Sequence, residues 1–237
     1  MDFTLYKQLR QLTNWLLPQN CISCQCSLNS AQTETYCDDC IAKLPYLESS
    51  CPRCGQPFTG DSDYCGKCLS QSPTFDACFC PFAYEEPISD DICRLKYGEQ
   101  PRTAIRLARL FARELNESNI DLPEALIPVP MHPTKLRKRG FNQSTELAKQ
   151  LGKLLDIPLA SHILSKQIAT PRQATQTLFQ RKTNLKGAFK IHGPADFKHL
   201  AIVDDVVTTG ATAEEIAKIL KKNGVDYVQV WGITRTR

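Results

Sequence analysis

Residues 200–213 of this chain, Leu-Ala-Ile-Val-Asp-Asp-Val-Val-Thr-Thr-Gly-Ala-Thr-Ala, place the tightest limit on its fold. A short apolar run, the pattern of a buried strand, ends in two adjacent carboxylates and is followed by a loop of small residues. A helix pattern with Glu214 and Glu215 in its first turn comes next. Strand, loop and helix in this order form half of a βαβ unit, so we expect an α/β fold with a parallel sheet.

The loop in this stretch carries the groups that a phosphate needs. Backbone N–H groups at the positive end of a helix bind anions, and Gly210 permits a φ angle or a close approach that a side chain would prevent. Loop hydroxyls come from Thr208, Thr209 and Thr212. The preceding Asp204 and Asp205 can accept hydrogen bonds from vicinal hydroxyls and can hold Mg²⁺ through water. The stretch therefore predicts a sugar-phosphate site; the alternative is an ordinary buried strand and its turn.

Cysteines are concentrated in one part of the chain, since all twelve lie between Cys21 and Cys93. Eight form Cys-x-x-Cys pairs, and these are Cys21/Cys24, Cys37/Cys40, Cys51/Cys54 and Cys65/Cys68. Two such pairs supply the four thiolates of a closed, structural zinc site, so we predict one or two zinc ions. We favour sequential use of the pairs; an interleaved arrangement is the alternative, and Cys26 lies close enough to Cys24 to compete as a ligand.

This uneven distribution predicts two domains, residues 1–74 with an N-terminal helix and a double zinc ribbon, and residues 75–237 with the parallel sheet. Leucines on one face of residues 3–17 predict that helix, which we expect to dock on the protein; a membrane-surface helix is the alternative.

Composition and charge exclude few functions. Hydrophobic residues make up 42% of the 237 and charged residues 23%, which is typical of soluble globular chains. No run approaches the ~18 apolar residues of a membrane span. No secretory leader is apparent, so we expect a cytoplasmic protein whose cysteines bind metal. The net charge of +4 is compatible with a phosphorylated ligand or with nucleic acid and is diagnostic of neither.

A basic segment, residues 132–143, follows a short apolar strand predicted at 126–130. We expect a loop on the pyrophosphate side of the site, because its cations can neutralise a departing anion. The candidate residues are Lys135, Arg137, Arg139, Gly140, Asn142 and Gln143. Asn142 is also expected to cap a helix that runs to about Leu155. A solvated turn and a contact with nucleic-acid phosphates are the alternatives.

Two further basic segments carry weaker signals. Lys96, in Leu95-Lys96-Tyr97-Gly98, is expected in solvent, with a ligand contact as the alternative. Residues 164–186 are polar and basic with few apolar anchors, which is typical of a flap that closes over a ligand and equally of a surface loop.

The pattern of residues 200–213 resembles the signature of type I phosphoribosyltransferases, which bind phosphoribosyl pyrophosphate (PRPP) with Mg²⁺. In those enzymes the two acids meet the ribose 2′- and 3′-hydroxyls, and the loop holds the 5′-phosphate. By position these roles fall to Asp204, Asp205, Thr208, Thr209, Gly210, Ala211 and Thr212. The resemblance implies a Rossmann-like parallel sheet of the phosphoribosyltransferase type.

The order of motifs resembles the competence protein F family over nearly the full chain. It runs from an apolar helix and the double four-cysteine module through Leu-Lys-Tyr-Gly, Pro-Val-Pro with Arg-Gly-Phe-Asn-Gln, and Arg-x-x-x-Gln-Thr, to the PRPP signature. Members join a zinc-ribbon region to a phosphoribosyltransferase-like domain and are associated with natural transformation. The resemblance implies single-stranded DNA as a partner, together with recombination or DNA-uptake proteins. It also places Arg172, Gln176 and Arg181 in the segment that covers the site.

Three functions stay open at this point. The first is a PRPP-binding protein that acts in transformation, with phosphoribosyl transfer as the reaction if it is an enzyme. The second is a nucleic-acid-binding adaptor with a vestigial transferase site, and the third is a nucleotide-salvage transferase. Purine salvage enzymes usually carry an Asp where this chain has Thr208, and an ordinary hydroxyl is a poor general base, so no catalytic residue is assigned.

Overall fold

The computed structural model describes residues 20–28, 36–97, 100–168, 185, 187–193 and 196–236. The helix expected at residues 3–17 and the predicted flap residues Arg172, Gln176 and Arg181 lie outside these described ranges. The chain folds as two compact units, Met1–Leu44 and Pro45–Arg237. This division reflects which parts of the chain pack together. The domain boundary expected after residue 74 was based on the distribution of cysteines, and it stays a prediction.

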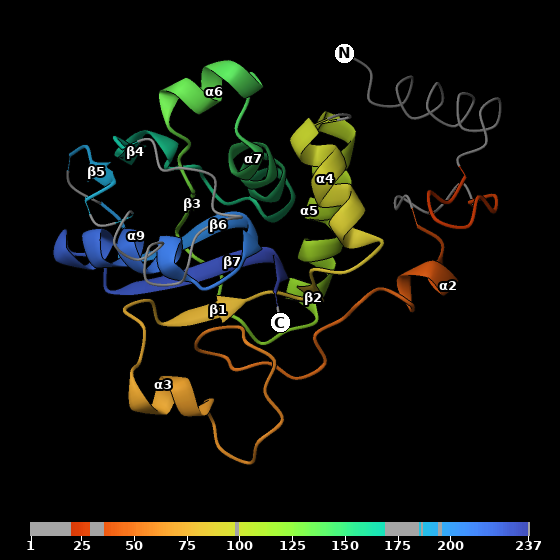
Figure 1. Ribbon diagram of the computed structural model, residues 1–237, viewed down its shortest axis with the longest axis horizontal. Coiled ribbons are helices and arrows are strands. Elements are labelled where there is room, and N and C mark those ends of the chain that lie inside the picture. The colour runs from red at the N-terminus through yellow and green to blue at the C-terminus, as the bar shows by residue number, and fades with distance from the viewer. Residues whose placement is uncertain are drawn as a thin grey trace. The chain divides into compact units, whose positions relative to one another are not determined.

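A parallel sheet forms the centre of the larger unit (Figure 1). Its strands are β1 (Ala77–Phe79), β2 (Phe82–Ala83), β3 (Ala125–Pro128), β6 (His199–Val207) and β7 (Tyr227–Arg235). The strand order across the sheet is β1, β7, β6 and β3. β2 also pairs with β7, at residues nearer the C-terminal end of β7 than those that pair with β1. All of these pairs are parallel, which confirms the α/β sheet predicted from the strand–loop–helix stretch.

Helices cover both faces of the sheet (Figure 1). The helices that pack on its strands are α5 (Gln100–Asn116), α7 (Gln143–Leu155) and α9 (Ala211–Lys222). α4 (Ile88–Tyr97) packs against α5, and α6 (Pro133–Arg139) has no buried residue. On β7, Val228 and Val230 share an apolar core with α9, whereas the ring of Trp231 lies 5.5 Å from that of Phe111 on α5. Because both faces are buried, β6 and β7 carry near-continuous apolar runs. Among the described residues, no helix has the length and apolar composition needed to cross a bilayer.

Smaller elements complete the described chain. They are α2 (Asp38–Ile41), α3 (Gly66–Ser70), the 3-10 helix η1 (Ser161–Ile163), β4 (Leu164–Lys166) and β5 (Phe189–Ile191). The last two strands form an antiparallel pair. β4 lies at the start of the segment that we predicted to be a polar flap or a surface loop. The sequence does not indicate this strand, because Leu164 alone among its three residues is buried and gives no strand periodicity.

Two helices predicted from the sequence are present. The helix capped by Asn142 is α7, and the helix with Glu214 and Glu215 in its first turn is α9. The loop predicted at 132–143 is wrong for its first half, where α6 forms. Pro133 suits the first turn of α6, the His132 side chain accepts a hydrogen bond from the Thr134 N–H at 3.3 Å, and Gly140, with φ 85°, ends the helix. No residue of α6 is buried, so the helix leaves no apolar periodicity in the sequence.

A buried ion pair joins α4 to α5. The guanidinium of Arg106 donates from Nε to Asp91 Oδ2 at 2.8 Å and from its second nitrogen to Oδ1, and the two residues are only 5% and 1% exposed. Removing one partner of such a pair leaves a buried charge with less compensation, which costs more than the pair itself contributes.

We predict that Arg106→Met lowers the free energy of unfolding by about 3 kcal/mol, because the buried Asp91 carboxylate loses both of its hydrogen bonds from this guanidinium. Urea denaturation followed by circular dichroism measures the change. The matched control is Arg113→Met on the same helix, where the side chain is 36% exposed and a change within about 0.5 kcal/mol is expected. Equal effects of the two substitutions would contradict the assignment.

Candidate functional site

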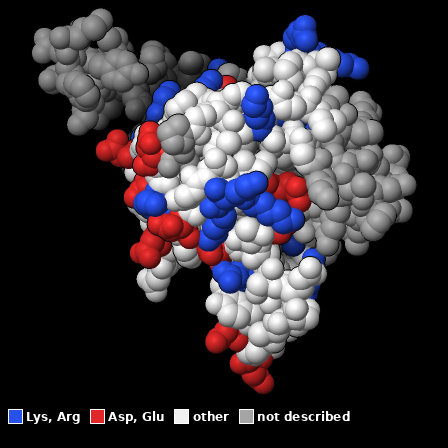
Figure 2. Space-filling view, turned by 90° about the vertical axis from the view of Figure 1, so that its left-hand side faces the viewer, with Lys and Arg blue, Asp and Glu red and all other residues white. Residues whose placement is uncertain are grey.

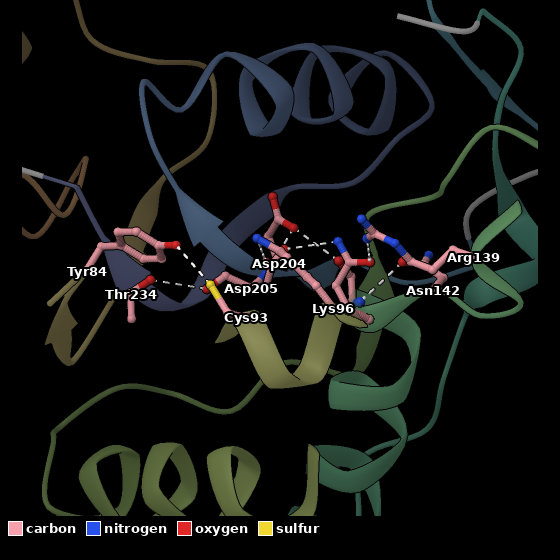
Figure 3. Close-up of polar contacts among 10 residues, drawn as sticks. Tyr84, Cys93, Lys96, Arg139, Asn142, Asp204, Asp205 and Thr234 are labelled. Atoms are coloured by element: carbon pink, nitrogen blue, oxygen red, sulfur yellow. Dashed lines mark hydrogen bonds and ion pairs between the residues drawn. The ribbon is translucent and has the colours of Figure 1, made fainter. Parts of the chain in front are cut away.

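The two acids of the predicted site lie at the carboxyl end of the parallel sheet. Asp204 and Asp205 are on β6, the loop 208–210 follows, and α9 begins at Ala211. The N-terminus of α7 lies beside them. Ligands of open parallel sheets bind at this edge, because loops and helix N-termini converge there. Figure 3 shows Asp204, Asp205 and Lys96 together, with Arg139 and Asn142 on one side and Tyr84 on the other.

Hydrogen bonds from α7 orient the acids. Ser144 Oγ donates to Asp204 Oδ1 at 3.0 Å, and Gln143 Nε2 donates to Asp205 Oδ1 at 3.3 Å. The backbone N–H of Asp205 also donates to Asp204 Oδ1, at 3.0 Å. Asp205 is buried and Asp204 is half-buried. The carboxylates are therefore fixed in direction by neighbours before any ligand arrives.

Lys96 is the counter-ion of the pair. Its Nζ lies 2.6 Å from Asp205 Oδ2, and its side chain is 22% exposed. Our expectation of a solvated lysine is therefore wrong. The preceding Leu95 is fully buried, which holds the last turn of α4 over the end of β6. A signal was available in the sequence, because two adjacent acids in a buried strand require a cation and the Leu-Lys-Tyr-Gly segment offers one.

The two carboxyls have opposite pKa shifts. Burial and the negative charge of Asp205 raise the pKa of Asp204 to about 8. Burial also acts to raise the pKa of Asp205, but the charge and hydrogen bond of Lys96, with a hydrogen bond from Gln143, outweigh it and lower that pKa. A proton on the pair is therefore favoured on Asp204, and Asp205 is favoured as the ionised member.

Part of the predicted pyrophosphate-side segment reaches this pair. Arg139 donates to Gln143 Oε1 at 2.8 Å, so a chain of contacts runs from Arg139 through Gln143 to Asp205. The Arg139 guanidinium also lies 5.4 Å from the centre of the Tyr97 ring. Asn142 caps α7, as predicted, by accepting from the Ser144 N–H at 3.2 Å.

The other cations of that segment lie on the exposed surface of α6. Lys135 and Arg137 are exposed, and Gly140 is the left-handed residue that ends the helix. Burial and the positive charge of Lys135 lower the pKa of Lys166 on β4, and the charge of Asp204 opposes this shift.

The loop after β6 has the conformation that its sequence predicts. Gly210 adopts φ 76°, and the Ala211 N–H donates to Thr209 Oγ1 at 3.3 Å. Thr208, Thr209 and Thr212 are half-buried, so their hydroxyls lie near the surface at the start of α9. The N-terminus of this twelve-residue helix is a suitable place for a phosphate.

Eight cysteines form two clusters within the described residues. The members are Cys21, Cys24, Cys37 and Cys40 in the first, and Cys51, Cys54, Cys65 and Cys68 in the second. Within each cluster the sulfur atoms lie within 4.8 Å of one another, which fits the sequential pairing and a tetrahedral zinc ion. Cys26 is exposed and belongs to neither described cluster.

The two clusters repeat the same local geometry. The Cys37 N–H lies 3.4 Å from the sulfur of Cys21, and the Cys65 N–H lies 3.4 Å from that of Cys51. Burial alone would raise both thiol pKa values, but such backbone hydrogen bonds lower the pKa of Cys21 to about 6 and that of Cys51 to about 7. A thiolate stabilised in this way is a ready zinc ligand.

The chain is similar to known proteins over most of its length. Residues 12–69 match the double zinc ribbon domain family. Competence protein F of Haemophilus influenzae is 37% identical over 225 residues, which cover 91% of this chain and 96% of that protein. DNA utilization protein YhgH of Shigella flexneri is 36% identical over 204 residues, 84% of this chain and 90% of that protein.

Solved structures also align, at lower identity. A purine phosphoribosyltransferase from Pyrococcus horikoshii covers 55% of this chain and 80% of its own, with 21% identity and a TM-score of 0.34.

We predict that the full chain binds two zinc ions, one in each described cluster. Cys37→Ser should reduce the content to one, because three sulfur ligands and an oxygen form a weaker site. Elemental analysis of the purified protein measures the ratio. Cys26→Ser is the matched control and should keep both ions; loss of zinc from this variant would show that the ligand set is different.

We predict a pH-dependent stability effect at Asp204. Between the ordinary Asp value of 3.8 and about 8 the folded protein binds a proton here that the unfolded chain has lost. Rising pH therefore reduces the stability that Asp204 contributes. The advantage of Asp204→Asn over the native protein should grow from pH 5 to pH 8, by less than about 1.4 kcal/mol per pH unit.

Urea unfolding at several pH values measures this difference. Asp226→Asn is the control, because it removes a carboxyl group from a side chain that is 74% exposed. A pH-independent difference for Asp204→Asn would contradict the raised pKa.

Proposed function

Because the chain belongs to the competence protein F family, we propose that its site at the end of β6 binds PRPP with Mg²⁺ and that the protein acts on internalised single-stranded DNA during transformation. The observation that carries this proposal is the fixed carboxylate pair directly before a phosphate-binding loop. Such a pair matches a ligand that has a phosphate at one end and vicinal hydroxyls beside it.

Each part of PRPP has a counterpart among the described residues. Asp204 and Asp205 would accept hydrogen bonds from the ribose hydroxyls, and loop 208–212 would hold the 5′-phosphate at the start of α9. The pyrophosphate would lie toward α6, where Arg139 is already anchored to Gln143. Carboxylate and phosphate oxygens are suitable Mg²⁺ ligands, and the ion would neutralise the pyrophosphate when bound.

The proposed binding requires a change of charge at the acids. Asp204 must lose its proton before both of its oxygens can accept from hydroxyls. Lys96 compensates Asp205 in the free protein and can turn toward the phosphates when the ribose takes its place. Transfer of the phosphoribosyl group to an acceptor is the reaction class that this site would serve.

Single-stranded DNA is the proposed macromolecular partner. Exposed cations on α6 support it, and so do the two relatives, which are named as a competence protein and a DNA utilization protein. The face shown in Figure 2 is a poor candidate for DNA, because basic and acidic side chains lie next to each other there. We place the protein in the reducing cytosol, where four-cysteine zinc sites persist. Retention of labelled single-stranded DNA that falls steeply with salt would support this partner, and no retention at low salt would exclude it.

We predict that the native protein binds PRPP with Mg²⁺ in calorimetry and that Asp204→Ala with Asp205→Ala weakens binding roughly 100-fold or more, since each hydrogen bond to a charged group contributes about 1.5–3 kcal/mol. Asp226→Ala is the matched control and should bind normally. Ribose 5-phosphate and pyrophosphate, titrated separately, report on the two halves of the site. Unchanged binding in a folded, zinc-containing double variant would refute the assignment.

A further inference from the structure

The second zinc ribbon, residues 51–68, belongs to the same compact unit as the parallel sheet. Its first knuckle lies directly on β1. The Cys78 N–H donates to Pro52 O at 2.9 Å, and a Cβ on Gly55, which has φ 68°, would lie 2.9 Å from Cys78 Sγ. Arg53 donates to Asp76 O at 2.8 Å. The ribbon is therefore in close contact with the sheet that carries the proposed phosphate loop.

One contact from this ribbon reaches the start of the loop. Gln56 follows the first knuckle, and its Oε1 accepts from the Arg235 guanidinium at 2.6 Å. The other terminal nitrogen of Arg235 donates to Val207 O at 3.0 Å. Val207 is the last residue of β6 before the loop, and Arg235 is only 1% exposed. Arg235 therefore links the knuckle to the backbone from which the loop departs.

A second contact reaches the end of the loop. The segment that leaves the ribbon contains Thr74, whose N–H and hydroxyl both donate to the carboxylate of Glu214, each at 2.8 Å. Glu214 lies in the first turn of α9. The next residue, Phe75, is 3% exposed, and its ring lies 3.6 Å from the position of a Cβ on Gly210. The loop is thus held at both ends and supported in the middle.

The ribbon itself has little apolar core. Within the described residues its buried cluster consists of Cys51, Cys65 and Cys68, with Cys54 and Phe58 packed against it. A segment of this kind depends on its metal for a fixed shape, because four thiolates replace the missing core. The positions of Gln56 and Thr74 should therefore depend on whether zinc occupies this cluster.

We propose that zinc in the second four-cysteine site holds loop 208–212 in its phosphate-binding shape, with Gln56, Arg235 and Glu214 as positioning residues. Loss of this metal would weaken phosphate binding without altering any group that touches the ligand. The proposal rests on the proposed PRPP function of the loop. It assigns the second zinc ribbon a role in ligand affinity, in addition to its role in folding.

The test uses the full chain in its zinc-loaded form and four variants. Cys54→Ser weakens the second site, and Cys24→Ser is the matched change at the equivalent position of the first. Gln56→Ala removes the acceptor for Arg235 and leaves every cysteine in place. Gln56→Glu keeps an acceptor for Arg235 and loses only the 3.3 Å bond from Gln56 Nε2 to Thr236 O. Calorimetry with PRPP and Mg²⁺ gives the dissociation constant, and hydrogen–deuterium exchange reports on the backbone of residues 207–214.

We expect Cys54→Ser and Gln56→Ala to weaken PRPP binding by roughly tenfold, a typical coupling between two sites, and to speed exchange at residues 207–214. Cys24→Ser and Gln56→Glu should behave like the native protein. If the native protein binds PRPP and both Cys54→Ser and Gln56→Ala bind it with the native affinity, the coupling is overturned and the proposed function stays intact. If the native protein does not bind PRPP, the proposed function fails, and unchanged exchange in both variants would then separately overturn the coupling.

Discussion

The buried carboxylate of Asp205 links three elements of the larger unit, because it lies on β6 and contacts Lys96 of α4 and Gln143 of α7. A carboxylate buried at the end of a strand is costly without a nearby cation, because the desolvation penalty of an isolated charge amounts to several kcal/mol. Here the cation comes from the last turn of α4, and a hydrogen-bond donor, Gln143, comes from the first turn of α7. The packing of these helices around β6 is therefore tied to the charge that they must balance. The same arrangement leaves Asp204 to hold a proton.

The parts of the fold and site that the sequence predicts are those with local causes. The β6–α9 stretch, the Asn142 cap and the cysteine pairs each depend on residues a few positions apart, where periodicity and spacing are informative. Lys96 was misassigned because its partner is more than a hundred residues away, and a lone lysine near a helix end is usually solvated. The contact between Gln56 and Arg235, 179 positions apart, has no local signal at all.

The two zinc ribbons show that a repeated sequence pattern determines local geometry more firmly than it determines role. In both, a backbone N–H lies 3.4 Å from the first cysteine of the ribbon, and this contact follows from the spacing of the cysteines. What surrounds each cluster depends on the rest of the chain. Only the structure reveals that the knuckle formed by Cys51 and Cys54 packs against β1. Gly55 approaches Cys78 there so closely that a side chain would not fit.

The proton on Asp204 also makes hydrogen ions competitors for the site. Any ligand that needs both carboxylates ionised must displace that proton, so ligand and proton occupy the pair in turn. The apparent affinity should then increase from acidic conditions up to about pH 8, where the carboxyl ionises without help. Acidification would empty the site even though neither the ligand concentration nor the positions of the binding residues had changed.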